Sequence, residues 1–119
     1  IVSAKVFELT ESDQRRLSTG ALDPEREAWI ELDPGASLSI RAWEPGDRFK
    51  PLGAPGRKKL KDWFIDRKIP QKERSTRPLV IDQSGEVIWV PGFPPADRYR
   101  ITDESKQALR LTYQAVKTL

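Results

Sequence analysis

The chain has 119 residues, which is enough for one domain with a modest core. Hydrophobic residues make up 37% and charged residues 33%, as is typical of soluble globular proteins, and no apolar run approaches the roughly 18 residues of a membrane helix. Cysteine and histidine are absent, which excludes disulfides, thiol nucleophiles, the usual zinc ligand sets and imidazole bases.

The net charge of +3 conceals an asymmetry along the chain. Residues 1–40 carry a net charge of −4, residues 41–77 carry +7, and residues 78–119 carry zero. A basic block inside a nearly neutral chain indicates a surface for a polyanion such as nucleic acid. The alternative interpretation is an ordinary solvated basic face.

The N-terminal part is predicted to contain one strand and one short helix. Residues 2–9 form the strand, and residues 11–17 form the helix, with Thr10 or Ser12 as its N-cap and an end near Gly20. Residues 21–27 have the polar composition of a linker. Because the chain begins at Ile1 rather than Met, we expect it to belong to a longer protein. We interpret residues 1–27 as a connecting segment and residues 28–119 as the domain.

Two hairpins are predicted from alternating patterns and turn signals. Residues 28–32 and 37–43 alternate with period two, and the Asp33–Ala36 segment between them suits a type II turn. A similar turn follows at Glu44–Asp47. The second hairpin joins residues 78–82 and 86–90 through a loop that contains Gly85. Towards the C-terminus we expect a helical turn from Thr102 or Asp103 to about residue 108, and then a strand over residues 109–115.

A basic amphipathic helix is predicted between Gly56 and Pro70, in the stretch GRKKLKDWFIDRKIP. Three basic residues, Arg57–Lys59, fall where the first turn should be, although the positive end of the helix dipole favours acidic residues there. An external anion would supply the missing negative charge, since helix N-termini bind phosphate readily. We also expect an i,i+4 pair between Lys58 and Asp62.

The tryptophans are better explained as core residues than as stacking platforms for bases. Trp63 lies between Leu60 and Phe64 on the apolar face of the predicted helix, and the other three tryptophans, Trp29, Trp43 and Trp89, alternate within strands. Strands dominate with one distinctive helix among them. The sequence therefore predicts an α+β domain built on packed antiparallel sheets.

Three motifs in fixed order resemble the C-terminal domain of bacterial tRNA(Ile)-lysidine synthetase. They are RAWEPGDRFKPLG (residues 41–53), KKLKDWFIDRKIP (58–70) and IWVPG (88–92), and the similarity extends from about Ala28 to Tyr113. The resemblance implies a β-sandwich-like fold that is shared with a domain of the phenylalanyl-tRNA synthetase β chain.

The resemblance also implies a function for the parent protein. Enzymes of this family use ATP to ligate lysine to the wobble cytidine of the AUA-reading tRNA(Ile). Catalysis, ATP and Mg²⁺ belong to an N-terminal domain with a Ser-Gly-Gly-x-Asp-Ser loop, which this chain lacks. We therefore expect the chain by itself to be non-catalytic and without a cofactor or metal.

The partners that the resemblance implies are the acceptor stem of tRNA(Ile) and the catalytic domain of the same protein. It also implies that the protein acts in the cytoplasm and does not bind a membrane. The residues expected to bind RNA are Arg48, Lys50, Arg57, Lys58, Lys59, Lys61, Arg67, Lys68, Arg74 and Arg77. Gly46 and Gly92 are expected to serve turns. The alternative is a structural or dimerisation domain of the same enzyme whose basic helix meets an acidic protein surface, in a homodimer for example.

Overall fold

The computed structural model describes residues 2–20, 22–31 and 36–114. Its elements in chain order are β1 (Val2–Glu8), α1 (Glu11–Ser18), β2 (Glu27–Ile30), β3 (Leu38–Ala42), β4 (Arg48–Phe49), β5 (Lys58–Lys59), α2 (Leu60–Asp66), α3 (Gln71–Arg74), β6 (Pro78–Asp82), β7 (Val87–Trp89), the 3₁₀ turn η1 (Asp97–Tyr99) and β8 (Gln107–Tyr113). Within these ranges no helix is both long and apolar enough to cross a membrane.

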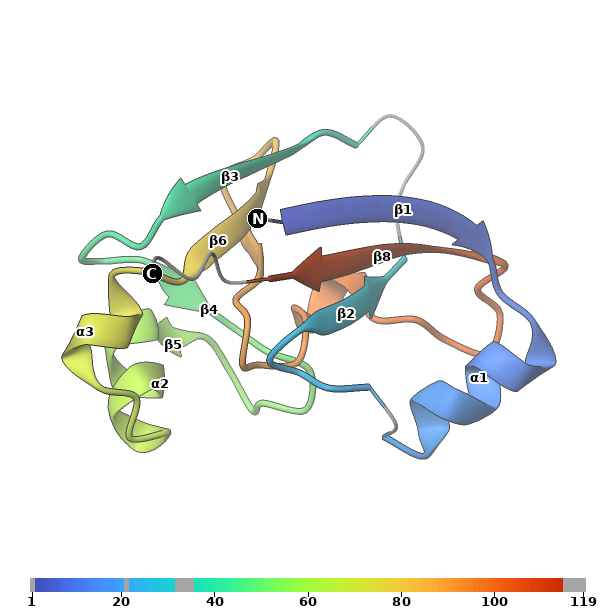
Figure 1. Cartoon of the computed structure of the whole chain (residues 1–119), viewed down its shortest axis with the longest axis horizontal. Coiled ribbons are helices and arrows are strands. Elements are labelled where there is room, and N and C mark those ends of the chain that lie inside the picture. The colour runs from blue at the N-terminus through green and yellow to red at the C-terminus, as the bar shows by residue number, and fades with distance from the viewer. Residues whose placement is uncertain (1, 21, 32–35, 115–119) are drawn as a thin grey trace.

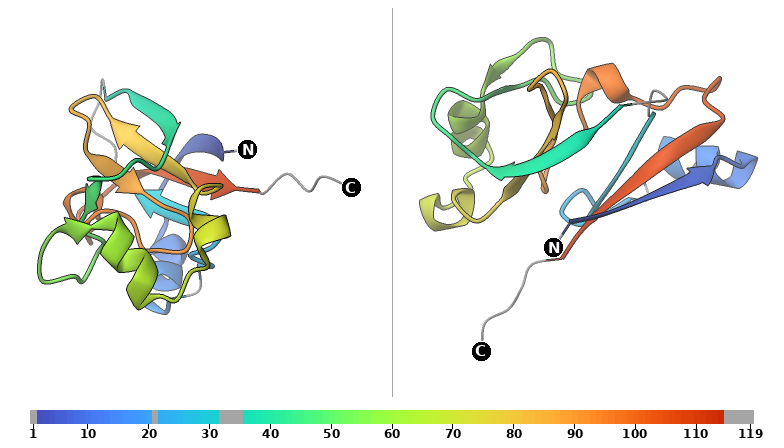
Figure 2. Two further views of the ribbon diagram at one scale, coloured as in Figure 1. Left: turned by 90° about the vertical axis from the view of Figure 1, so that its left-hand side faces the viewer. Right: turned by 90° about the horizontal axis from the view of Figure 1, so that it is seen from above.

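The strands form three antiparallel sheets (Figure 1). β8 lies between β1 and β2 in the first sheet, β6 lies between β3 and β7 in the second, and β4 pairs with β5 in a short third sheet. The helices α2 and α3 lie with the β4–β5 sheet at one end of the molecule, and α1 lies at the opposite end (Figures 1 and 2). The predicted α+β class of antiparallel sheets is confirmed.

One hydrophobic core joins the two larger sheets and α2. The β8-centred sheet contributes Ala28 and Leu111, the β6-centred sheet contributes Leu79 and Ile88, and all four are at most 2% exposed. The largest fully buried side chains are Trp89, Phe49, Phe64, Phe93, Ile30 and Leu60. Burial of each such side chain stabilises the fold by roughly 1.5 to 3 kcal/mol, so this core fixes the positions of the loops around it.

The predicted N-terminal strand and helix are confirmed. β1 pairs with β8 along its whole length, and Phe7 packs edge-on against Trp29 with the ring centroids 4.8 Å apart. Thr10 is the N-cap of α1: its hydroxyl accepts from the Asp13 N–H at 3.1 Å, and its own N–H donates to the Asp13 carboxylate at 2.9 Å. This reciprocal capping box satisfies two backbone donors that would otherwise lack partners.

The predicted hairpin of residues 28–43 is wrong. β2 pairs with β8 and β3 pairs with β6, so the two strands belong to different sheets. Alternation showed that each segment is a strand but carried no information on its partner, which is distant in the sequence. Most of the predicted first turn, residues 33–35, lies outside the described residues.

The second predicted turn is confirmed. The Asp47 N–H donates to the Glu44 carbonyl at 3.2 Å, and Gly46 has a φ of +97°, which an L-residue with a side chain rarely adopts. Arg41 donates two hydrogen bonds to the Asp47 carboxylate, at 2.7 and 2.9 Å, and they lower its pKa. The turn therefore enters β4 in a fixed direction.

The C-terminal prediction needs one correction. Thr102 accepts a single turn bond from the Ser105 N–H, and strand β8 already begins at Gln107, so the helical turn does not reach residue 108. Gln107 and Ala108 are extended because they pair with Glu8 and Phe7 of β1.

The predicted hairpin of β6 and β7 is confirmed, and a buried carboxylate organises its turn. Asp82 is 4% exposed, accepts from the Ser84 N–H, the Ser84 hydroxyl and the Glu86 N–H, and receives the Tyr99 hydroxyl at 2.7 Å. Burial acts to raise the pKa of Asp82, but hydrogen bonds from Ser84, Tyr99 and the backbone outweigh it and lower the pKa to about 2.

This lowered pKa predicts a loss of stability in acid. A carboxyl group with a normal unfolded pKa near 3.9 and a folded pKa of about 2 contributes stability above pH 4 that is lost as the pH falls to 2. The contribution is about 2 kcal/mol. Asp82→Asn should therefore lower the free energy of unfolding at pH 7, and its deficit should shrink between pH 4 and pH 2 in urea titrations. Asp103→Asn, at an exposed position, is the control. A deficit of equal size at both pH values would contradict this role of Asp82.

Candidate nucleic-acid interface

The helix in the basic segment begins later than predicted. Lys58 and Lys59 form strand β5, and Leu60 is the first residue of α2, whose backbone N–H donates to the Asp47 carbonyl at 2.8 Å. Pairing with β4 therefore keeps Lys58 and Lys59 out of the helix, and Arg57 precedes them. Asp62 occupies the first turn of α2, where the helix dipole favours an acidic residue. The charge mismatch that the sequence predicted in this helix does not exist.

A different charge mismatch lies in the β4–β5 sheet. Arg48 pairs directly with Lys59 across the two strands, and both side chains are exposed. The bond from Leu60 to Asp47 flanks this pair, which makes it a non-hydrogen-bonded pair, the type in which facing side chains lie closer together. Like charges in directly opposite positions destabilise a sheet.

The neighbouring pair of the same ladder faces the protein interior. Phe49 is 1% exposed, and its partner Lys58 is half-buried. The Lys58 ammonium lies 4.0 Å from the centroid of the Trp63 ring and donates a hydrogen bond to the Asp66 carboxylate. The predicted pair with Asp62 is wrong, because Lys58 precedes the helix and reaches Asp66 near its other end.

The C-terminal end of α2 places two further basic residues. Lys68 has a φ of +55°, in the left-handed region, and its N–H donates to the Ile65 carbonyl at 3.0 Å. Ile69 is buried, and its N–H donates to the Phe64 carbonyl at 2.9 Å, which completes a Schellman motif. The Arg67 guanidinium lies 4.9 Å from the centroid of the Phe93 ring.

Like Lys58, three further predicted RNA-binding residues are engaged inside the domain. Lys50 lies 3.5 Å from the Asp97 carboxylate, and the Arg74 Nε donates to the Ile69 carbonyl at 3.0 Å. The Arg77 side chain is 13% exposed, donates to the Pro91 carbonyl and forms ion pairs with Glu25 and Glu73.

Arg77 also explains a glycine. Gly92 has a φ of +101°, and a Cβ atom at this position would lie 2.7 Å from Nη1 of Arg77. Gly92 therefore serves the turn after β7, and it also leaves space for the buried guanidinium.

A subset of the predicted residues remains available for a ligand. Among the described residues, six of them are exposed and have no ion pair with a carboxylate: Arg48, Arg57, Lys59, Lys61, Arg67 and Lys68. All six belong to β4, β5, α2 or the segments that adjoin them, at the end of the molecule where these elements gather (Figure 1).

The tryptophans have the structural positions that were expected. Trp29 and Trp89 are buried, and the half-buried Trp43 and Trp63 pack against the core cluster. The Trp63 Nε1 donates to the Phe49 carbonyl at 2.9 Å, so this ring is fixed beneath the β4–β5 sheet.

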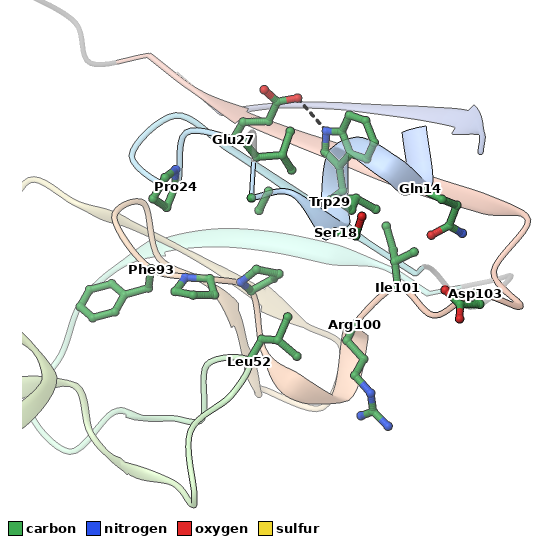
Figure 3. Close-up of a pocket in the computed structure, with 16 residues that line it drawn as sticks. Gln14, Ser18, Pro24, Glu27, Trp29, Leu52, Phe93, Arg100, Ile101 and Asp103 are labelled. Carbon is green, nitrogen blue, oxygen red and sulfur yellow. Dashed lines mark hydrogen bonds between the residues drawn. The ribbon is translucent and has the colours of Figure 1, made fainter. Parts of the chain in front are cut away.

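A separate pocket of about 480 Å³ lies beside α1 and β2 (Figure 3). Leu17, Pro24, Trp29, Pro95 and Ile101 give it a largely apolar lining. None of the ten predicted RNA-binding residues, all of which are described, lines it. The pocket and the basic surface are therefore distinct features of the domain.

Sequence reasoning did not find two residues that shape the basic surface. Asp66 holds Lys58 from eight positions away, a separation that no helical or strand periodicity signals. Phe49 points into the core and thereby sets which face of β4 is exposed, but a strand of two residues is too short to show an alternating pattern in the sequence.

The fold and the site define a class of protein: a small domain of antiparallel sheets with a cationic surface built on a short ladder and one helix. The chain belongs to the family described as the TilS substrate C-terminal domain, whose model matches residues 38–113. The family resemblance noted from the three motifs is confirmed.

Curated relatives agree with this membership. The tRNA(Ile)-lysidine synthases of Bacillus subtilis (54% identical over 56 residues), Caldanaerobacter subterraneus subsp. tengcongensis (40% over 76) and Geobacter sulfurreducens (44% over 82) match 47%, 64% and 67% of this chain. The matches cover only 12%, 16% and 17% of those relatives, so the chain spans less than a fifth of their length.

Two solved structures have similar folds. A crystal structure of a TilS C-terminal domain matches with a TM-score of 0.72 and 29% identity, over 98% of this chain and 85% of that one. An N-terminal fragment of the phenylalanyl-tRNA synthetase β-subunit from Pyrococcus horikoshii matches with a TM-score of 0.66 and 20% identity, over 94% of this chain and 39% of that one. At this identity the second likeness concerns the fold alone.

The conformation of Lys68 gives a stability prediction. Left-handed backbone costs an L-residue roughly 1 to 2 kcal/mol, part of which glycine gives back through its greater freedom in the unfolded chain. Lys68→Gly should therefore raise the free energy of unfolding by about 0.5 to 1 kcal/mol in urea titrations. Lys68→Ala, which removes the charge but keeps a Cβ atom, is the matched control and should give no such gain. Equal stabilisation by both variants would assign the effect to charge instead.

Proposed function

We propose that this chain is the tRNA-binding module of a tRNA(Ile)-lysidine synthase and that its cationic surface contacts the acceptor stem of tRNA(Ile). The observation that carries the proposal is the cross-strand pair of Arg48 and Lys59. Among the described residues, neither side chain has an ion pair with a carboxylate. Two exposed cations held side by side repel each other, and neighbouring phosphate groups of an RNA backbone, one at each cation, would relieve this repulsion.

Family membership supports a nucleic acid as the anion. The relatives are enzymes that their names connect with a tRNA, and the exposed basic residues of residues 48–68 gather at the end of the domain that holds β4, β5 and α2. A double-stranded stem presents phosphates and 2′-hydroxyl groups on a shallow groove that is recognised mostly by shape. Arg57, Lys61 and Lys68 would add sequence-independent phosphate contacts that set the position of the stem.

The proposal assigns lysine ligation, ATP and Mg²⁺ to the larger part of the enzyme that this chain does not contain, and it places the protein in the cytoplasm. Binding of the stem by this domain would raise the effective concentration of the same tRNA at the catalytic domain. Modest affinity in the isolated domain would therefore suffice.

The proposal predicts salt-dependent binding of an isoleucine tRNA transcript. For four or five phosphate contacts, the logarithm of the affinity should fall against the logarithm of the salt concentration with a slope of about −3 to −4 in fluorescence anisotropy titrations. A hairpin RNA with the acceptor-stem sequence should compete better than one with the anticodon stem. Absence of binding at low salt, together with concentration-dependent sedimentation, would favour the structural or dimerisation role instead.

The cross-strand pair gives the sharpest mutational test. Replacement of Arg48 and Lys59 together by Met should reduce the magnitude of the salt slope by about 1.4 to 1.8, because two phosphate contacts are lost. Lys106→Met is the matched control, since Lys106 is an exposed lysine beside β8, away from the β4–β5 sheet. A double variant that keeps the wild-type slope and remains folded would contradict the proposed site.

A further inference from the structure

Lys58 and Lys59 are adjacent in the sequence but have opposite orientations. Side chains alternate between the two faces of a strand, so Lys58 joins Phe49 on the inner face while Lys59 joins Arg48 on the outer face. The burial pattern agrees, because Lys58 is half-buried and Lys59 is exposed. The two lysines are therefore identical in type and adjacent in the motif, but only Lys59 is freely accessible to a ligand.

The environment of Lys58 neutralises its charge within the protein. Its ammonium group contacts the Asp66 carboxylate and lies 4.0 Å from the centroid of the Trp63 ring. Trp63 in turn donates to the carbonyl of Phe49, the cross-strand partner of Lys58. We call these four residues, Phe49, Lys58, Trp63 and Asp66, the Lys58 clasp. The clasp ties the β4–β5 sheet to α2 through three different interactions.

Each interaction of the clasp is modest by itself. A cation–π contact and an ion pair at the surface are each weak, because water screens the charges. Their joint effect is geometric, because they hold the Lys58 end of the two-residue strand β5, whereas the buried Leu60 holds the other end. Displacement of Lys58 from the clasp would tilt β5 and separate Lys59 from Arg48.

We propose that Lys58 is a positioning residue of the basic surface and makes no phosphate contact. In this role it holds the outer face of the ladder, Arg48 with Lys59, in the arrangement that receives the anion. The inference rests on the proposed function, and it separates two neighbouring lysines that the motif alone treats as equivalent.

The test compares Lys58→Met with Lys59→Met in the 119-residue chain, with an isoleucine tRNA transcript as the probe. Lys59→Met should reduce the magnitude of the salt slope by about 0.7 to 0.9. Lys58→Met should leave the slope unchanged, lower the melting temperature and weaken binding by a factor of a few, and Lys58→Arg should restore both properties, because a guanidinium also stacks on a ring and pairs with a carboxylate. A slope that falls equally in both Met variants would overturn the proposal.

Asp66→Asn supplies an independent check. If Lys58 acts only through the clasp, loss of its carboxylate partner should lower the melting temperature without a steeper salt slope. If the magnitude of the salt slope instead increased by about 0.7 to 0.9, the value of one phosphate contact, the freed Lys58 would bind phosphate. This result would also overturn the proposal.

The indole N–H resonance of Trp63 provides a readout that does not depend on RNA. It should shift in Lys58→Met and remain in place in Lys59→Met, and the reverse pattern would contradict the clasp. If the wild-type chain showed no salt-dependent binding of the tRNA, the proposed function would fail. The Trp63 resonance would still show whether the clasp exists.

Discussion

Burial of Phe49 fixes the orientation of the basic surface. Because side chains alternate along a strand, an inward Phe49 places Arg48 outward, and the ladder then places Lys59 beside it. Leu60 is buried immediately afterwards and begins α2. Burial of the two apolar side chains contributes several kcal/mol, whereas a like-charged cross-strand pair costs at most about 1 kcal/mol. The core can therefore hold two cations together at a position where each destabilises the other.

Much of the fold could be predicted where the deciding interactions are local. β1, the capped helix α1, the Glu44–Asp47 turn and the β6–β7 hairpin depend on alternation, a capping residue or a turn residue within a few positions. The pairing of β2 with β8 and of β3 with β6 depends on contacts between segments that lie tens of residues apart. Two strands that were close in the sequence therefore appeared to be a hairpin, although they belong to different sheets.

The candidate site could be predicted by residue type but not by availability. The ten basic residues were evident from charge and motif, yet Lys50, Lys58 and Arg77 have carboxylate partners in the fold. The partners Asp97, Asp66 and Glu25 give no local signal because each lies outside the reach of a helix turn or a tight turn, whereas Glu73, the second partner of Arg77, lies only four positions away. The charge mismatch that suggested an anion, in the first turn of the helix, does not exist, and a different one lies in a two-residue ladder that sequence periodicity cannot detect.

The central claim is that the Arg48–Lys59 pair gives up some stability in the free domain in order to bind an anion. A double-mutant cycle tests it most directly, with unfolding free energies of the wild type, Arg48→Met, Lys59→Met and the double variant at low salt, without and with isoleucine tRNA. The account predicts a repulsive coupling energy of a few tenths of a kcal/mol in the free domain, and RNA should abolish or reverse it. A coupling energy of zero in the free domain, or one that RNA leaves unchanged, would contradict it.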